Sequence, residues 1–368
     1  MLRKVSVISN SIRLRCSSVP LNIITRSNSI TSSLSSLSSL SSSLSSLLSS
    51  TADYRSLVSE ERVVLGKLHT ALQSCNAPVD DLDLIADTRA RIDDLFMLVI
   101  VGEFNAGKST FINALLGERY CKEGILPTTD KICIMRSSSK HNNSINTGWR
   151  RADNMLLDDV QEMDLPLDWM EDIAIIDTPG TNAIISRHQQ LTQQIVPRAD
   201  LVLFVTSAER PITESESHFL TKIKQWGKKV IIIVNKIDIL DNEKDREDLM
   251  SYVGQNVGKI IGSMKPIPVF GVSAKLALSS KLVSKDVGDP SLGVGAKSYH
   301  DSKIETIEKF LMSSLGKEEL LRNKLENPLN VADRMIADSI QSLDKRSIIV
   351  EGDRRILVWI DENMEIFM

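Results

Sequence analysis

The residues from Gly102 to Thr110 have the composition and spacing of a phosphate-binding loop. They read GEFNAGKST, after an apolar run at 96–101 and before a stretch of helical periodicity at 108–117. Glycines let the backbone wrap around phosphates, and N–H groups at the start of a helix supply positive potential. In this pattern Lys108 reaches the β- and γ-phosphates, and the Ser109 hydroxyl ligates Mg²⁺. Taken alone, the match also fits an ATP site or chance.

Three later motifs each follow an expected strand and together indicate a guanine nucleotide. Asp177 opens DTPG, where a carboxylate can reach the magnesium shell through water. Asp238 closes NKID, where it would accept from N1–H and the exocyclic amine of guanine, a donor pair that adenine lacks. Ser273, Ala274 and Lys275 would close the base pocket. Singly, these fragments also fit an Asp-Gly turn, a strand-end Asn and a surface Lys, but their order predicts GTP.

The switch segment is expected in LPTTD, residues 126–130. A threonine there would complete the magnesium coordination and sense the γ-phosphate. We favour Thr129 over Thr128, so Ser109, Thr129 and, through water, Asp177 are the predicted metal ligands. The predicted GTP contacts are Gly102, Asn105, Ala106, Gly107, Lys108, Ser109, Thr110, Asp177, Gly180, Asn235, Lys236, Asp238, Ser273, Ala274 and Lys275.

Catalysis would depend on Lys108, Ser109, Thr129 and Asn105. Small GTPases place a water-orienting Gln after the DTPG-type motif, but this chain has Thr181 there. Asn105 could hold K⁺ between the phosphates in place of an arginine finger. The alternative is that Asn105 only caps the loop through local hydrogen bonds. Arg187 and His188 are expected to be surface or dimer-contact residues.

Runs of Val, Ile and Leu alternate with amphipathic stretches from residue 96 to residue 273, which predicts an α/β fold. We expect a mostly parallel sheet covered by helices on both faces, with helical segments on either side of this domain. Strands are expected at 96–101, 131–136, 173–177, 200–206, 229–235 and 267–273, and helices at 108–117, 187–196, 213–226 and 244–260. Flanking helices are expected at 53–75, 80–95, 301–315 and 317–345, with a break at 76–78 and a loop at 281–300.

The first fifty residues form a separate region. They contain five basic residues, no Asp or Glu, and a Ser/Leu tract from 27 to 50. This composition is typical of an organellar transit peptide, and the alternative is a tail without an address. The formal charge of −4 gives no electrostatic basis for binding nucleic acid. No run approaches 18 consecutive apolar residues, so no membrane-spanning helix is predicted.

Several long phrases resemble dynamin-like GTPases of the mitofusin and fuzzy-onion-like type, in particular the plant chloroplast branch. They are GEFNAGKSTFINALLG (102–117), LPTTD (126–130), DTPGTN (177–182) and VPRADLVLFVTSAERPITESE (196–216), with NKID and SAK. The resemblance implies a helical neck at 51–95, a dynamin-type GTPase domain at 96–316 and the start of a stalk at 317–350. Before these we expect the transit region at 1–50, and after them an atypical tail at 351–368, where the chain departs from the family.

The resemblance also implies a function. Such proteins use GTP to remodel or fuse organelle membranes, here of the chloroplast, with the mitochondrion as the alternative. The expected partner is a second copy, docked through the GTPase face, or a full-length paralogue. The family's long stalk and membrane segment would follow residue 350, so we expect a truncated or spliced form that meets membranes only indirectly. Two alternatives are an organellar GTPase of ribosome assembly or tRNA modification, and a non-catalytic form that regulates full-length partners.

Overall fold

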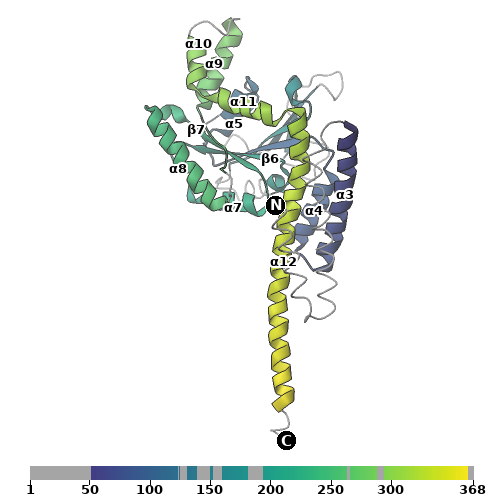
Figure 1. Cartoon of the computed structure of the whole chain (residues 1–368). Helices are drawn as coiled ribbons and strands as arrows, with labels where there is room; N and C mark the ends of the chain where they lie inside the picture. Colours follow the sequence, from purple (N-terminus) through teal and green to yellow (C-terminus); the bar gives the residue numbers. More distant parts are fainter. Residues whose placement is uncertain are drawn as a thin grey trace. The chain divides into compact units, whose positions relative to one another are not determined.

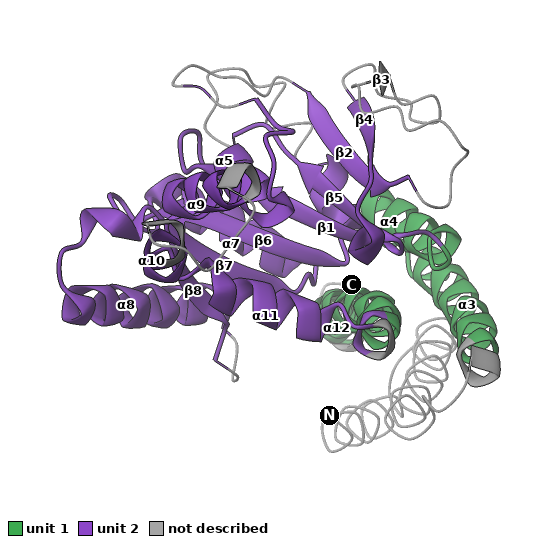
Figure 2. Cartoon of the chain, turned by 90° about the horizontal axis from the view of Figure 1, so that it is seen from above, with its two compact units in different colours: residues 1–93, 321–368 green, residues 94–320 purple. Residues whose placement is uncertain are grey.

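The computed structural model describes residues 51–122, 124, 131–138, 150–151, 160–180, 194–262, 266–287 and 294–363. The chain divides into two compact units, shown in different colours in Figure 2. Residues 94–320 form the sheet unit. Residues 1–93 and 321–368 belong to the second, which we call the helical unit and which is described at 51–93 and 321–363.

The described part of the sheet unit contains eight strands in one sheet, in the order β3-β4-β2-β5-β1-β6-β7-β8. Strand β2 runs antiparallel to β5, and β3 antiparallel to β4, while every other neighbouring pair is parallel. The predicted mostly parallel sheet is therefore confirmed. The strands are β1 (Phe96–Val101), β2 (Ile132–Ser137), β3 (Arg150–Arg151), β4 (Val160–Leu165), β5 (Ile173–Asp177), β6 (Leu201–Ser207), β7 (Val230–Asn235) and β8 (Val269–Val272).

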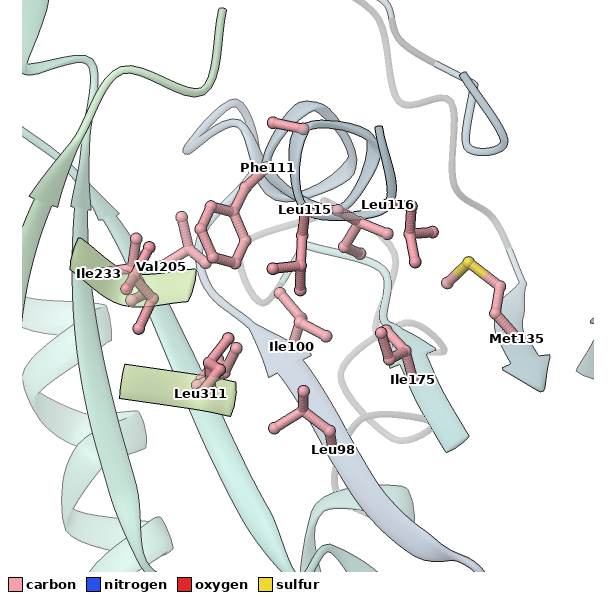
Figure 3. Close-up of a cluster of buried hydrophobic side chains, with 14 of the residues drawn as sticks. Leu98, Ile100, Phe111, Leu115, Leu116, Met135, Ile175, Val205, Ile233 and Leu311 are labelled. Atoms are coloured by element: carbon pink, nitrogen blue, oxygen red, sulfur yellow. The ribbon is translucent and has the colours of Figure 1, made fainter. Parts of the chain in front are cut away.

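Helices cover both faces of the sheet, as predicted (Figure 1). One face packs against α5 (Lys108–Leu116), α9 (Ala274–Val287) and α11 (Ile304–Ser314), and the other against α7 (Glu214–Gln225) and α8 (Glu243–Ile261). Strand β1 shows why its six residues are all apolar: successive side chains point to opposite faces, and both faces are buried. Leu98 and Ile100 join the cluster under α5 (Figure 3), whereas Val99 and Val101 join the one under α7.

The helical unit consists of α3 (Thr51–Ser74), α4 (Val79–Ala90) and most of α12 (Lys317–Asn363). Its core joins Leu65, Leu68 and Leu72 of α3 to α12 residues that include Leu325 and Ile336. The predicted break between α3 and α4 is confirmed and has a clear backbone cause.

Asn76 ends α3 in the left-handed conformation, with φ of 54°. The N–H of Ala77 donates to Leu72 O at 3.1 Å, and that of Asn76 to Gln73 O at 3.2 Å. This is a Schellman-type end. Pro78 then precedes α4, where its missing N–H is not needed.

Three local expectations were wrong. Residues 281–300 are not a continuous loop, because α9 runs to Val287 and α10 spans Val294–Asp301. Buried Ala277 and Leu278 hold α9 against the sheet. The serines of α9 had suggested a loop. Strands β3 and β4 were missed, since VQEMDL is rich in polar residues. Helix α4 ends at Ala90 instead of residue 95.

The last helix is also longer than predicted. It was expected to end at residue 345, and the stretch from 351 was expected to be an atypical tail, yet α12 continues to Asn363. Gly352 is the only glycine among residues 346–360, and nothing lies within 4 Å of a Cβ built there. Among the described helices, none is both long enough and apolar enough to cross a membrane. The expected helix at 187–196 lies mostly outside the described residues.

Candidate functional site

The phosphate-binding loop links β1 to α5 and needs its glycines for steric reasons. Gly102 has φ of 153°, and a Cβ there would lie 2.0 Å from Val205 O. Gly107 has φ of 88°, and its Cβ would lie 2.2 Å from Asn235 Nδ2. Gly180, from DTPG, packs so closely that its Cβ would lie 2.8 Å from the Phe104 backbone. Side chains at these positions would push the loop away from its neighbours.

Lys108 is the first residue of α5 and is only 7% exposed. Its Nζ donates to Gly102 O at 3.2 Å and to Glu103 O at 2.9 Å, so the lysine lies beneath the loop that it follows. Burial lowers the pKa of Lys108, and the nearby carboxylates of Asp177, Glu216 and Glu103 oppose this shift. A buried cation surrounded by backbone oxygens and carboxylates has the charge needed to bind phosphate.

Ser109 meets Asp177 directly behind this lysine. Ser109 Oγ donates to Asp177 Oδ2 at 2.9 Å, across 68 residues of sequence. Asp177 is 1% exposed, and burial raises its pKa to about 6, against the lowering effects of Lys108 and Ser109. The second oxygen, Oδ1, is buried without a hydrogen-bond partner among the described residues. A hydroxyl beside an unsatisfied carboxylate oxygen fits a hard divalent cation such as Mg²⁺.

Asn235 brings the later motifs to the phosphate-binding loop. Its Nδ2 donates to Ala106 O at 2.9 Å, and its Oδ1 accepts from Lys236 N at 2.8 Å and Ala274 N at 3.0 Å. One buried amide therefore joins the loop after β1, the loop after β7 and the start of α9. Sequence reasoning predicted Asn235 as a nucleotide contact, whereas its amide here is used to hold three backbone segments together.

The predicted base-binding residues lie around this amide. Ser273 is fully buried and its N–H donates to Ser302 O at 2.9 Å, while Lys275 is exposed. Lys236 has φ of 66°, and its Nζ lies 3.1 Å from Glu209 Oε2. Asp238 is exposed, and its carboxylate makes no hydrogen bond or ion pair with the described residues. It therefore has the freedom to accept from a base.

Asn105 stands at the tip of the loop, exposed and with φ of 62°. Its side chain makes no hydrogen bond within the part of the chain that the structure describes, so the loop-capping alternative finds no contact there. Thr110, the last residue of the motif, lies in the first turn of α5. Thr128, Thr129, Thr181, Arg187 and His188 lie outside the described residues.

Sequence reasoning missed an acidic cluster beside the loop. Glu103 accepts hydrogen bonds from Thr213 and Ser215 at the start of α7, and Glu216 is 1% exposed behind them. Burial raises the pKa of Glu216 to about 7, although hydrogen bonds from Thr213 and Thr206 lower it. The helix itself was expected at 213–226, and the T-x-x-E spacing of Thr213 and Glu216 is the capping-box signal at its start.

Comparisons with known proteins find GTPases similar to this region of the chain. Residues 97–236 match the family model described as 50S ribosome-binding GTPase. The "Probable transmembrane GTPase FZO-like, chloroplastic" of Arabidopsis thaliana is 38% identical over 306 residues, which is 80% of this chain and 32% of the relative. Over most of its length the chain is similar to this fuzzy-onion-like GTPase. The resemblance stated from the sequence is thereby confirmed, and the match to GTPases implies that the chain binds a guanine nucleotide.

Other relatives cover the same region of the chain. The "Uncharacterized protein in xynA 3'region" of a Caldicellulosiruptor strain is 30% identical over 67% of this chain and 64% of its own length. GTPase Der of Aquifex aeolicus is 23% identical over 72% of the chain and 51% of the relative. A structure of an oligomerised bacterial dynamin pair has a TM-score of 0.47 at 18% identity, covering 85% of this chain and 52% of that one. The chain spans about a third of the length of the chloroplastic relative from Arabidopsis.

Proposed function

We propose that Lys108, Ser109 and Asp177 form the reaction centre at which this chain hydrolyses GTP to GDP and phosphate. The observation that carries the proposal is the cluster of these three side chains, with Ser109 2.9 Å from Asp177 and Lys108 buried beside both. A water oxygen would bond to the γ-phosphorus as the bond to the β–γ bridging oxygen breaks. Lys108 would neutralise charge on the β- and γ-oxygens, which is the main requirement of phosphoryl transfer.

The donor set favours Mg²⁺ as the metal. Mg²⁺ supplies charge neutralisation and a fixed geometry for the phosphates when bound. Ser109 would ligate it directly, and Asp177 would hold it through water, with Thr129 as the proposed ligand from the switch segment. The described residues contain no cluster of three or more His, Cys, Asp or Glu side chains that could hold an ion, so the phosphates would complete the coordination.

Base recognition is assigned to Asp238, whose exposed carboxylate would accept both donors on the guanine edge. Asn235 would keep this loop in register with the phosphate-binding loop through Ala106 and Ala274. Lys236 and Lys275 would flank the base, and Ser273 would fix the backbone beside it.

The first test measures multiple-turnover phosphate release from GTP. Lys108→Ala removes the buried cation, so GTP binding and turnover should both collapse, while Ser109→Asn should spoil the metal ligation and favour GDP. Lys244→Ala, on an exposed part of α8, is the matched control and should keep wild-type rates. Wild-type turnover in Lys108→Ala would contradict the assignment.

We further propose that the chain acts in the chloroplast, in the organisation of its membranes, and works as a homodimer through the nucleotide face. The name of the Arabidopsis relative and the acid-free residues 1–50 support the chloroplast address, whereas the homodimer is carried over from the family resemblance. Import into isolated chloroplasts and mitochondria, compared with a variant that lacks residues 1–50, tests the address. Uptake by mitochondria alone would contradict it.

A second candidate is an organellar GTPase of ribosome assembly, favoured by the description of the matching family model. Co-purification of ribosomal RNA with the chain would support this candidate over the membrane role. A third is a form that regulates longer partners without turnover. Phosphate release over many turnovers by the isolated chain would exclude it.

A further inference from the structure

One carboxylate ties the phosphate-binding loop to the first turn of α7. Glu103 Oε1 accepts hydrogen bonds from Thr213 Oγ1 and from Ser215 Oγ, each at 2.5 Å. These donors are 110 and 112 residues away in the sequence. Hydrogen bonds from hydroxyls to a carboxylate are short and about twice as strong as neutral ones. The side chain of Glu103 therefore anchors the loop to α7.

The direction of these bonds is fixed by the rest of the cluster. Thr213 Oγ1 accepts the N–H of Glu216 at 3.2 Å, so its own proton is available for Glu103. The buried carboxylate of Glu216 accepts from Thr213 N at 3.0 Å and from Thr206 Oγ1 at 3.0 Å. Thr213 is thus held on one side by Glu216 and presents its hydroxyl on the other.

The segment before α7 does not hold this shape by local preference. Ile212 has φ of 57°, a left-handed conformation that a β-branched residue rarely adopts. Its N–H donates to Thr206 Oγ1 at 3.4 Å, within the same hydrogen-bond network. Such conformations persist where the surrounding structure imposes them, and they cluster at functional sites. The network therefore fixes the position of the two hydroxyls that hold Glu103.

The backbone of Glu103 carries this anchoring to the phosphate site. Its carbonyl oxygen accepts from Lys108 Nζ at 2.9 Å, so the side chain of one residue is fixed on α7 while its backbone touches the phosphate-binding lysine. The same carboxylate lies near enough to Lys108 to act on its charge. Glu103 thus influences Lys108 both through geometry and through its negative charge.

We propose that Glu103 is a positioning residue that holds the loop and Lys108 in place for GTP, while its negative charge limits nucleotide affinity. This inference rests on the proposed nucleotide binding at Lys108. Glu103, Thr213 and Ser215 form a clamp with two opposing effects on nucleotide affinity. Positioning of the loop raises the affinity and the charge of Glu103 lowers it, and substitutions can separate the two.

The test compares Glu103→Ala with Glu103→Gln, using fluorescent GDP binding and the KM and kcat for GTP. Glu103→Ala releases the loop, so the GDP Kd and the KM should rise by about tenfold or more, with a smaller change in kcat. Glu103→Gln keeps an oxygen that accepts from both hydroxyls but removes the charge. Because the charge that limits affinity is gone, its Kd should fall severalfold below the wild-type value. Ser215→Ala removes one donor and should lie between Glu103→Ala and wild type.

Glu214→Gln is the matched control, since Glu214 is exposed on the same turn of α7, and its affinity should stay at the wild-type value. Thermal melting of each variant confirms that the chain is folded. An unchanged Kd and KM in Glu103→Ala would overturn the inference, as would a Gln variant that binds no more tightly than wild type. If wild type itself bound no guanine nucleotide, the proposed function would fail instead.

Discussion

The candidate nucleotide site lies where β1, β5 and β7 end, at what we call the nucleotide edge, or sheet edge, of the sheet unit. This edge and the core of the helical unit both bury charged groups, but the groups around these charges differ. At the sheet edge, Lys108 is surrounded by Asp177, Glu216 and Glu103, so each buried charge has an opposite charge nearby. In the helical unit, Glu61 is 3% exposed, and its Oε1 has no hydrogen-bond partner among the described residues. Burial raises the pKa of Glu61 well above its ordinary value, and no other cause contributes.

The two regions therefore differ in what their buried carboxyl groups can bind. The one at the nucleotide edge can interact with a ligand, whereas the one in the helical unit only loses hydration. Asp177 keeps one oxygen unsatisfied beside Ser109, where a divalent cation would use it. Glu61 faces the apolar cluster of α3 and α12, where its neutral form is favoured. Binding of nucleotide and a divalent cation should therefore satisfy the buried polar groups at the nucleotide edge. Replacing Glu61 by an apolar residue should instead increase the stability of the helical unit.

The largest expected effect is at the exposed end of the nucleotide edge. Asp238→Asn replaces an acceptor by an amide whose NH₂ would face the donors of guanine. GTP affinity should fall by about a hundredfold or more, while xanthosine triphosphate, which offers an acceptor there, should bind better. Competition binding with both nucleotides measures the change, and Asp241→Asn in the next exposed loop is the control. An unchanged preference would mean that Asp238 does not contact the base.

The next effect concerns the monovalent cation at Asn105. Turnover should be faster in K⁺ than in Na⁺ or Li⁺ at equal ionic strength, because K⁺ would occupy the place of an arginine finger. Such fingers change rates by about 10³–10⁵, so even a partial substitute should give about tenfold. Asn105→Ala should remove the difference while GTP stays bound. Equal rates in all three cations at saturating protein would leave Asn105 without this role.

The sequence predicted the strands and loops of the nucleotide site better than it predicted the neighbouring elements. Continuous apolar runs identified the strands that carry the motifs, and the motifs identified Lys108, Ser109, Asp177 and Asp238. Strand β4 was missed because Glu162 pairs with Arg136 of β2, a contact between strands that gives no local apolar pattern. Helix α9 was not predicted, because its serines suggested a loop.

The clamp on Glu103 shows a second limit of sequence reasoning. The capping box at Thr213 and Glu216 is local and readable, but its link to Glu103 joins residues 110 apart. The same holds for Asn235, whose amide reaches Ala106 across 129 residues. Long-range hydrogen bonds of this kind depend on the folded sheet, which alone brings the loops together.

A smaller effect is expected on the pH dependence of Mg²⁺ binding at Asp177. Its pKa of about 6 means that the ionised form needed for Mg²⁺ is lost as pH falls below 6. The Mg²⁺ affinity of the complex with a non-hydrolysable GTP analogue should fall by up to about tenfold per pH unit there, beyond the change measured for free nucleotide in the same buffers. An affinity that follows free nucleotide at every pH would show that Asp177 does not hold the metal.

The smallest effect is expected at Glu61, where a change should stabilise the chain. Because the pKa of Glu61 is higher in the folded state, the folded helical unit binds more protons than the unfolded chain, and its stability falls as pH rises from about 4.5 through the raised pKa. Glu61→Leu should remove this dependence and raise the free energy of opening by about 1–3 kcal/mol at neutral pH. Hydrogen exchange of the α3 and α4 amides measures it without contribution from the sheet unit. Glu60→Gln, at the exposed neighbouring position, should change neither value. If Glu61→Leu opens more readily than wild type, the carboxyl group has a stabilising partner, and the contrast with the sheet edge fails.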